Sequence, residues 1–374
     1  MDARPLCAVV LAAGEGTRMH SERPKPLHRL CGRPMILHVL DALAELPVKK
    51  VVVVVGHRGE WVTKTLVDHA PPSLSIEFVE QPEQLGTADA LAVGLTALPD
   101  TLADDDGDVV VLPGDTPLVR PPTLASLVRH HRSAGAAATL LTALLGDPTG
   151  YDRVVRGKDE AVVKVVEDAE ITDEEVYVDE VATTIHCFRH SMLPPALRRL
   201  RPVGPTGEHS LTGLYAVFHD AGYRVESLVL GDPMEAAGVN DRAQLAVAEA
   251  ELRDRINERW MRRGVTMWDP ERTYVDATVH LEPDVVLLPG VVLQGDCRIA
   301  AGAEIGPDTR LVDTAVGEGA VVTANSARRA VIGENARVGP FASLGPGARV
   351  ESAGVVGPFT HIGGQPDDTD STLG

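Results

Sequence analysis

A glycine-containing loop near the N-terminus carries residue types that bind phosphate. It reads LAAGEGTRM over residues 11–19, directly after an apolar run and before an expected helix. Gly14 and Gly16 let backbone amides approach a phosphate, and the start of a helix favours negative charge there. Arg18 and Lys25, a lysine held between two prolines, offer cations to phosphate oxygens. The loop matches neither the Walker A motif nor the GxGxxG fingerprint, so it predicts a phosphate site without naming its ligand.

Polar residues that could join this site stand at four further positions. Asp115 follows the apolar run 109–113, and a carboxylate at the carboxyl end of a parallel strand faces the ligand side of the sheet. Asn240 precedes a helical pattern, where asparagine is commonly a helix cap. Gln81 has an amide that presents a donor and an acceptor together, and Glu167 lies in the acidic run EDAE. By residue type alone, Asn240 could instead be a helix cap, Gln81 a surface amide and Glu167 a solvated charge.

The elements that must position these residues alternate between strand and helix over about the first 230 residues. Five short aliphatic runs have the composition of strands that are buried on both faces of a parallel sheet. These runs are residues 7–12, 51–55, 76–80, 109–113 and 138–144. Residues 34–46 have a helical pattern, with Pro34 suited to the first helical position. The alternation predicts a doubly wound α/β sheet whose ligands bind at the carboxyl ends of its strands.

The last third of the chain changes character after one long amphipathic helix. Residues 241–263 place apolar side chains about one turn apart, and Gly264 is suited to end the helix. From Val275 an aliphatic residue recurs at every sixth position, and this step resumes at Ile332 after an irregular segment. The period predicts a parallel β-helix of hexapeptide repeats. We expect a first domain at 1–238, a linking helix at 239–264, a β-helix at 265–364 and a disordered tail at 365–374.

Composition limits the classes of function that remain. The chain has 374 residues, a net charge of −19 and 3% aromatic residues, which argues against binding to nucleic acid or to an anionic membrane. An anionic small substrate stays compatible, because a local cluster of cations can hold a phosphate. No apolar stretch approaches the roughly 20 residues of a membrane span. The four cysteines are scattered without CxxC spacing, so we expect a reducing cytoplasm and neither a disulfide framework nor a structural zinc site.

Several motifs, taken in their order, resemble one family of bacterial enzymes. LAAGEGTRMHSERPKPLHRLCGRPMILHVLDAL is similar to the start of the bifunctional N-acetylglucosamine-1-phosphate uridylyltransferases/glucosamine-1-phosphate acetyltransferases. The resemblance continues through EQPEQLGTADA, VVVLPGDTPL, GVNDRAQL and RINERWMRRGVTMWDP and covers nearly the whole chain. It implies a Rossmann-like nucleotidyltransferase domain, a linking helix and a short left-handed parallel β-helix. It also implies that a sugar 1-phosphate oxygen attacks the α-phosphorus of a pyrimidine nucleoside triphosphate, UTP first, with Mg²⁺ as cofactor and pyrophosphate as leaving group.

The resemblance also implies roles for individual residues. Arg18 and Lys25 would be catalytic and balance charge on the reacting phosphates, while Asp115 and Asn240 would be the Mg²⁺ ligands. The nucleotide-binding positions of the family match Leu11, Ala12, Ala13, Gly14, Gly16, Gln81, Gly86 and Thr87. Its sugar-binding positions match Gly150, Asp152, Glu167 and Ala182.

Departures from the family fall mainly on the sugar side of the expected pocket. Asp152 stands where the family has a glycine in GYGR, and Ala182 stands where it has an asparagine that contacts the sugar. The family's GTGHA is GTADA here, with Asp89, and its YLTD is SLTG at residues 210–213. Two alternatives stay open. The substrate is N-acetylglucosamine 1-phosphate, or it is another sugar or cyclitol 1-phosphate, with dTTP or a purine nucleotide as the less favoured donor.

The resemblance weakens within the β-helix. The family's acetyltransferase site lies beyond the stretch that matches GPFTHIGG, and the arginine of its LRPG motif is Gly345 here, so we expect no acetyltransferase activity. His280 and His361 are not expected to act as catalytic bases. The β-helix is expected to bury a homotrimer interface, as in the family. A non-catalytic binding or regulatory relative is the alternative from another class, and the retained phosphate and metal positions argue against it.

Overall fold

A computed structural model describes residues 4–104, 106–158, 160–202 and 207–364. It divides the chain into two compact units, which are described separately. Residues up to His28 and Pro34–Leu245 form the first, and Arg29–Arg33 with residues from Ala246 onward form the second. The expected boundaries at residues 238 and 264 stay predictions, and the expected tail at 365–374 lies outside the described residues.

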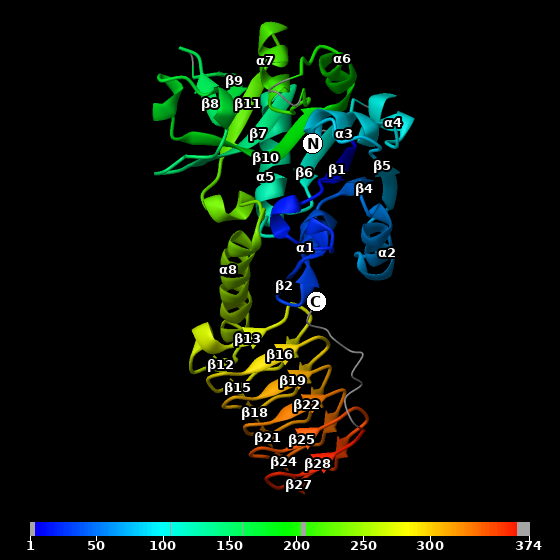
Figure 1. Cartoon of the computed structure of the whole chain (residues 1–374), viewed down its shortest axis with the longest axis vertical. Helices are drawn as coiled ribbons and strands as arrows, with labels where there is room; N and C mark the ends of the chain where they lie inside the picture. The colour runs from blue at the N-terminus through cyan, green and yellow to red at the C-terminus, as the bar shows by residue number, and fades with distance from the viewer. Residues whose placement is uncertain (1–3, 105, 159, 203–206, 365–374) are drawn as a thin grey trace. The chain divides into compact units, whose positions relative to one another are not determined.

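A nine-stranded mixed sheet forms the centre of the described part of the first unit (Figure 1). Its strands are β1 (Leu6–Ala12), β4 (Val48–Val55), β5 (Ile76–Glu80), β6 (Asp108–Pro113), β7 (Ala138–Leu144), β8 (Arg153–Arg156), β9 (Val162–Val166), β10 (Glu180–Arg189) and β11 (Val225–Val229). The main path runs β11-β7-β10-β6-β1-β4-β5, with β8 paired to β10 and β9 paired to β8. All five strands that the aliphatic runs predict are present, which confirms the α/β fold.

The central strands are apolar on both faces because each face packs against helices. Successive residues of a strand point to opposite faces. Ala8 and Val10 of β1 therefore join one core cluster, and Cys7 and Val9 join another. The first cluster lies under α1 (Met35–Ala44), α2 (Gly59–His69) and α5 (Pro121–Ala134). The second lies under α3 (Thr87–Leu95), α6 (Leu193–Leu197) and α7 (Gly213–Asp220), while α4 (Asp100–Asp104) adds Leu102. This double cover explains why the strands read as continuous aliphatic runs.

Two details of the first unit differ from the expectation. The sheet is not fully parallel, because β10 pairs antiparallel with β6 and β7. The chain passes from β7 to β10 through the antiparallel pair of β8 and β9 rather than through a crossover helix, which is the usual connection between parallel strands. Pro34 also lies one residue before the first helical position, as the N-cap of α1.

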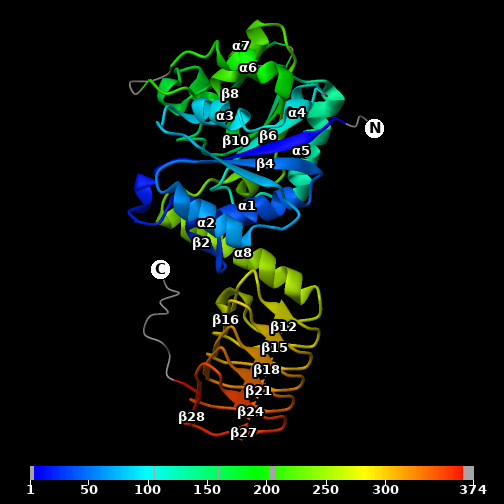
Figure 2. The ribbon, with the colours of Figure 1, turned by 90° about the vertical axis from the view of Figure 1, so that its right-hand side faces the viewer.

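The second unit contains a helix and three parallel sheets of very short strands (Figure 2). One sheet contains β12 (Thr266–Met267), β15 (Val286–Leu287), β18 (Glu304–Ile305), β21 (Val321–Val322), β24 (Arg337–Val338) and β27 (Val355–Val356). The next contains β13 (Tyr274–Val275), β16 (Val292–Gln294), β19 (Arg310–Val312), β22 (Ser326–Arg328), β25 (Ser343–Leu344) and β28 (His361–Ile362). The third contains β14 (His280–Leu281), β17 (Arg298–Ile299), β20 (Ala315–Val316), β23 (Val331–Ile332) and β26 (Arg349–Val350). This arrangement confirms the predicted β-helix.

The aliphatic positions of the repeat form the core of this β-helix. Leu287, Leu293 and Ile305 are completely buried, and the remaining members of the series are buried or nearly so. In the irregular segment, the distance in sequence between successive buried aliphatic residues shortens from six residues to five, as between Leu311 and Val316. The strands nevertheless keep their parallel partners. The coils therefore stay stacked through the interruption in the sequence pattern.

The predicted long helix is α8 (Arg242–Met261), whose residues Ile256 and Trp260 are buried in the core of the second unit. It ends before Gly264, which has a φ of +96°, a backbone conformation that suits glycine. Among the described residues, no helix is both long and apolar enough to cross a membrane.

Candidate active site

A cavity of about 220 Å³ opens beside the carboxyl ends of β1 and β6 in the first unit. Its lining residues are Leu11, Ala12, Gly14, Gly16, Thr17, Arg18, Lys25, Pro26, Asp115 and Asn240. Residues that are far apart in the sequence, namely the glycine loop, Asp115 and Asn240, thus share one cavity. Thr17 and Pro26 were not predicted, although their position inside the glycine loop and the Pro-Lys-Pro motif could have indicated them.

The backbone of the glycine loop brings Lys25 to this cavity. Gly16 has a φ of +65°, and a Cβ added there would lie only 2.6 Å from the Cβ of Lys25. Glycine is therefore required at this position for both its conformation and its lack of a side chain. No α-helix begins directly at the end of the loop, because the short 3₁₀ helices η1 (Thr17–Met19) and η2 (Lys25–Leu27) come first and the predicted helix of residues 34–46 begins only at Met35, as α1. η1 is a single short turn that ends at His20 in the left-handed conformation, so a phosphate at this loop would meet backbone amides and cations rather than the dipole of an α-helix.

The charged and polar groups of the cavity converge on the ammonium group of Lys25. Lys25 forms an ion pair with Asp115 and donates a hydrogen bond of 2.8 Å to Oδ1 of Asn240. Arg18 donates to the same Oδ1 at 3.1 Å. The ammonium group is largely buried, with 13% of the Lys25 side chain exposed. A carboxylate and an amide oxygen thus point at one cation, as ligands of a hard metal ion must do.

These donors fit Mg²⁺. Asp115 and Asn240 supply hard oxygen atoms, and Mg²⁺ is usually bound through one or two such groups with phosphates and water completing its octahedron. Within the described parts of the chain, no cluster of three His, Cys, Asp or Glu residues has the arrangement of a metal site. The reading of Asn240 as a helix cap is wrong, because its side chain bonds Lys25 and Arg18. Asp241 caps α8 instead, accepting the backbone N–H of Gln244 at 2.8 Å.

The predicted base-reading segment lies around the start of α3. Gln81 is only 5% exposed, and its Nε2 donates to Oδ2 of Asp89 at 2.8 Å and to the carbonyl of Gly86 at 3.3 Å. The amide therefore does not offer a donor and an acceptor together, since its donor is already used within the protein. Gln84 connects this segment to the glycine loop by donating a 2.8 Å hydrogen bond to the carbonyl of Ala13. Asp89 and Gln84 are contacts that the motifs did not indicate.

The predicted sugar-binding positions also lie close together. The N–H of Gly150 donates to Oδ1 of Asp168 at 3.1 Å, and the N–H of Asp168 donates to Oδ1 of Asp152 at 3.1 Å. The N–H of Ala182 donates to the carbonyl of Asp152 at 2.9 Å. Burial raises the pKa of Asp152, and the negative charges of Glu167 and Asp168 add to the rise. None of these residues lines the cavity of about 220 Å³, so the residues predicted to bind the sugar form a group separate from that cavity.

Residues 210–212 link the base and sugar segments. The N–H of Leu211 donates to Oγ1 of Thr87 at 3.0 Å, and Oγ1 of Thr212 donates to Glu167 at 3.4 Å. The SLTG segment, one of the departures from the family, therefore contacts both predicted segments.

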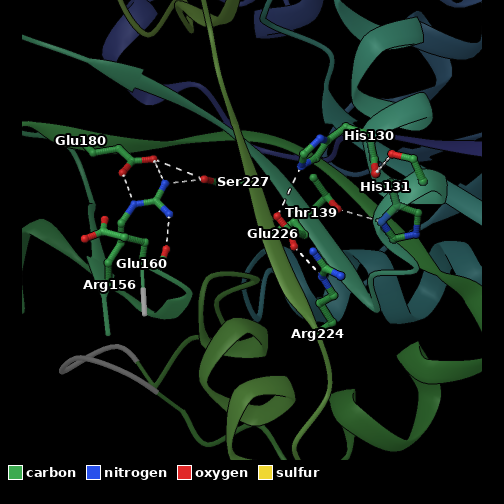
Figure 3. Close-up of polar contacts among 10 residues, drawn as sticks. His130, His131, Thr139, Arg156, Glu160, Glu180, Arg224, Glu226 and Ser227 are labelled. Atoms are coloured by element: carbon green, nitrogen blue, oxygen red, sulfur yellow. Dashed lines mark hydrogen bonds and ion pairs between the residues drawn. The ribbon is translucent and has the colours of Figure 1, made fainter. Parts of the chain in front are cut away.

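A partly buried ion pair joins β8 to the start of β10, the strand that carries Ala182. Figure 3 shows the guanidinium of Arg156, on β8, paired with the carboxylate of Glu180 through two hydrogen bonds of 2.8 Å. The same guanidinium donates to Oγ of Ser227 on β11 at 2.6 Å. Burial raises the pKa of Glu180, but the hydrogen bonds from Arg156 lower it further, and its pKa stays below the usual value. One guanidinium thus joins three strands, β8, β10 and β11.

Comparison with known proteins finds one matching family model and several relatives that are similar over nearly the whole chain. A family model described as a MobA-like NTP transferase domain matches residues 8–216. The bifunctional protein GlmU of Kineococcus radiotolerans is 44% identical over 359 residues, which are 96% of this chain and 72% of that protein. The protein of the same name from Desulfitobacterium hafniense is 42% identical over 355 residues, 95% of this chain and 76% of that protein. The one from Streptomyces avermitilis is 43% identical over 359 residues, 96% of this chain and 73% of that protein.

Proposed function

The chain belongs to the GlmU family of nucleotidyltransferases, and on this premise we propose that it transfers the uridylyl group of UTP to N-acetylglucosamine 1-phosphate. The observation that carries the proposal is the convergence of Arg18, Lys25, Asp115 and Asn240 on one cavity beside the glycine loop. Two cations and two oxygen donors suit a triphosphate that is bound together with a metal ion.

In the proposed reaction, a phosphate oxygen of the sugar 1-phosphate attacks the α-phosphorus of UTP. The bond from that phosphorus to the oxygen bridging to the β-phosphate breaks, and pyrophosphate leaves with the electron pair. Such a transfer depends on positioning and on neutralisation of charge rather than on a covalent intermediate with the protein. Arg18 and Lys25 would balance the charge of the reacting phosphates, while amides of the glycine loop would orient them. Asp115 and Asn240 would hold a Mg²⁺ ion, which would neutralise further negative charge on the triphosphate.

A second candidate keeps this chemistry but changes the sugar. Three carboxylates, Asp152, Glu167 and Asp168, lie together where the sugar is expected. An ionised carboxylate only accepts hydrogen bonds, so this group favours a sugar that presents hydroxyl or ammonium donors over one that presents an acetamide oxygen. The observation favours an amino sugar with a free amine, or a cyclitol, as the alternative substrate.

We also propose a homotrimer formed through the β-helix. Val355, Phe341 and Phe359 are 76%, 63% and 84% exposed, although each is a large apolar side chain. Phe341 and Phe359 stack on each other with their ring centroids 5.8 Å apart, and exposed apolar side chains of this kind on the β-helix support burial against other copies of the chain. The mass in solution at micromolar concentration tests this, and a monomer would contradict it. We place the enzyme in the cytoplasm, which is supported by four cysteines that all lie in described segments as buried, free thiols.

The experiment that tests the proposed function measures pyrophosphate release in the presence of Mg²⁺. UTP, dTTP, CTP, ATP and GTP are each combined with glucosamine, N-acetylglucosamine, glucose and galactose 1-phosphates. The highest kcat/KM with UTP and N-acetylglucosamine 1-phosphate supports the first proposal, and the highest value with glucosamine 1-phosphate supports the second. No release with any pair would contradict the first proposal and the free-amine form of the second, and a cyclitol 1-phosphate would then be the acceptor to test.

A further inference from the structure

The orientation of the Gln81 amide is fixed from both sides. Its Nε2 faces two oxygen atoms, Oδ2 of Asp89 at 2.8 Å and the carbonyl oxygen of Gly86 at 3.3 Å. Both neighbours accept hydrogen bonds, so the nitrogen of the amide, and not its oxygen, must point at them. Both hydrogens of Nε2 are thereby engaged. Oε1 is the atom left over, and it accepts no hydrogen bond from any side chain or backbone group in the described ranges.

The backbone on each side keeps this arrangement from shifting. The N–H of Gln81 donates to the carbonyl of Val55 at 2.8 Å, which ties it to β4. Gly86 has a φ of +103°, and a Cβ there would lie 2.5 Å from the carbonyl oxygen of His209. Asp89 lies in the first turn of α3, a helix packed on the sheet. The two acceptors therefore hold a fixed distance from the amide, and rotation of the amide would place oxygen against oxygen.

An amide held in this way presents only an acceptor to a base. Uracil and thymine carry an N3–H donor on the edge that such an acceptor would meet. Cytosine has an unprotonated N3, an acceptor, so its lone pair would face the lone pairs of Oε1. A buried acceptor left without a donor loses more than the hydrogen bond itself contributes.

We propose that Asp89 is a positioning residue that makes the nucleotide site selective for bases with an N3–H group. The inference rests on the proposed function, because it takes Gln81 as the residue that meets the base. It deepens that function by assigning base selectivity to a contact made entirely within the protein. Asp89 does not distinguish uracil from thymine, since both carry the same donor.

The test compares kcat/KM for UTP and for CTP in the full-length enzyme, with the best sugar 1-phosphate as co-substrate. In Asp89→Ala the amide of Gln81 loses its 2.8 Å acceptor and keeps only the carbonyl of Gly86 at 3.3 Å, so a rotation that offers Nε2 to cytosine costs less. The ratio of kcat/KM for UTP to kcat/KM for CTP should fall by about tenfold, which corresponds to the free energy of one hydrogen bond to a charged group. Turnover of CTP should rise in absolute terms. Damage to the fold would lower the turnover of both nucleotides together and would leave their ratio unchanged.

Two further variants complete the design. Asp89→Asn retains an oxygen that can accept from Gln81, so it should keep most of the selectivity. Glu83→Ala removes a carboxylate from an exposed position in the same segment and should leave the ratio unchanged. An unchanged ratio in an Asp89→Ala variant that keeps the wild-type Tm, with an active wild-type enzyme, would overturn the role of Asp89 and leave the proposed function standing. A wild-type enzyme without activity on any nucleotide would overturn the proposed function and this inference with it.

Discussion

Replacement of Asp115 by asparagine distinguishes the contribution of this residue to catalysis from its contribution to the stability of the fold. Asp115→Asn keeps the shape of the side chain but removes the negative charge that pairs with Lys25. Lys25 retains its 2.8 Å hydrogen bond to Asn240, so the ammonium group keeps a partner. The variant therefore changes the charge that a bound metal ion or phosphate would meet, with little change in packing.

The two effects of this substitution differ in size. The Asp115 and Lys25 side chains are 19% and 13% exposed, so the lost ion pair is partly screened by solvent. We expect a decrease of about 1–2 kcal/mol in the free energy of unfolding, the worth of one hydrogen bond between charged groups at such a site. Removal of one group that stabilises a charged transition state commonly costs about 10²–10³-fold in kcat. We therefore expect kcat to fall by at least about a hundredfold in a protein that remains folded.

The assay is pyrophosphate release at saturating UTP and sugar 1-phosphate, repeated over a Mg²⁺ titration, with thermal unfolding measured on the same preparations. Asp68→Asn is the matched control, because Asp68 is an exposed carboxylate on α2. The control should match the wild type in both measurements. If Asp115→Asn kept more than about a tenth of the wild-type kcat with an unchanged Mg²⁺ dependence, the assignment of Asp115 would be refuted.

Three further predictions concern the structure around the site. Gly86→Ala should destabilise the protein by about 1–3 kcal/mol, because a Cβ would lie 2.5 Å from the carbonyl oxygen of His209 at a φ of +103°; thermal unfolding measures this, and an unchanged Tm would contradict the geometry. Arg156→Gln should make the stability of the protein depend less steeply on pH in acid. Burial raises the pKa of Glu180, but Arg156 lowers it further, so the folded pKa lies below the unfolded value of about 4.3. The stability that this carboxylate contributes above about pH 4.3 is therefore lost as the pH falls through the folded pKa. Denaturant titrations between pH 6 and 3 measure that slope, and equal slopes in wild type and variant would count against it. Burial lowers the pKa of His186 to about 3, so below about pH 6.5 the unfolded chain binds a proton at this residue and the folded protein does not. The stability of the wild type should therefore decrease as the pH falls below about 6.5. His186→Phe should remove this part of the decrease in the same titrations.

Local sequence patterns predicted most of the fold. The strands buried on both faces of the sheet are unbroken aliphatic runs, and the β-helix has a period of six residues that no helix or ordinary strand shares. The antiparallel β10 was not predictable in this way, because its direction depends on the path of the chain through β8 and β9. The position of Cys31 is another feature that local patterns could not predict. It lies in the core of the second unit, and its N–H donates to Glu249 at 2.7 Å, a contact across 218 residues that no local pattern contains.

Some parts of the candidate site could likewise be predicted from the sequence, and others could not. The glycine loop, Lys25 and Asp115 carry their chemistry in their types and in their place relative to strands. Asn240 looks like a helix cap in the sequence, and only its hydrogen bonds with Lys25 and Arg18 place it in the cavity. The pairing of Gln81 with Asp89 reverses the expectation that both ends of the amide are free. Such contacts depend on side-chain distances that a motif does not specify.

The most direct test of the central claim is phosphorus NMR of the purified protein with Mg²⁺, UTP and N-acetylglucosamine 1-phosphate. Attack on the α-phosphorus predicts that a nucleotide sugar diphosphate and pyrophosphate appear in equal amounts as both substrates are consumed. Replacement of the sugar by glucosamine 1-phosphate in a parallel sample distinguishes the two candidate acceptors. Orthophosphate as the only product, or unchanged spectra with both sugars, would contradict nucleotidyl transfer at the cavity of Arg18, Lys25, Asp115 and Asn240.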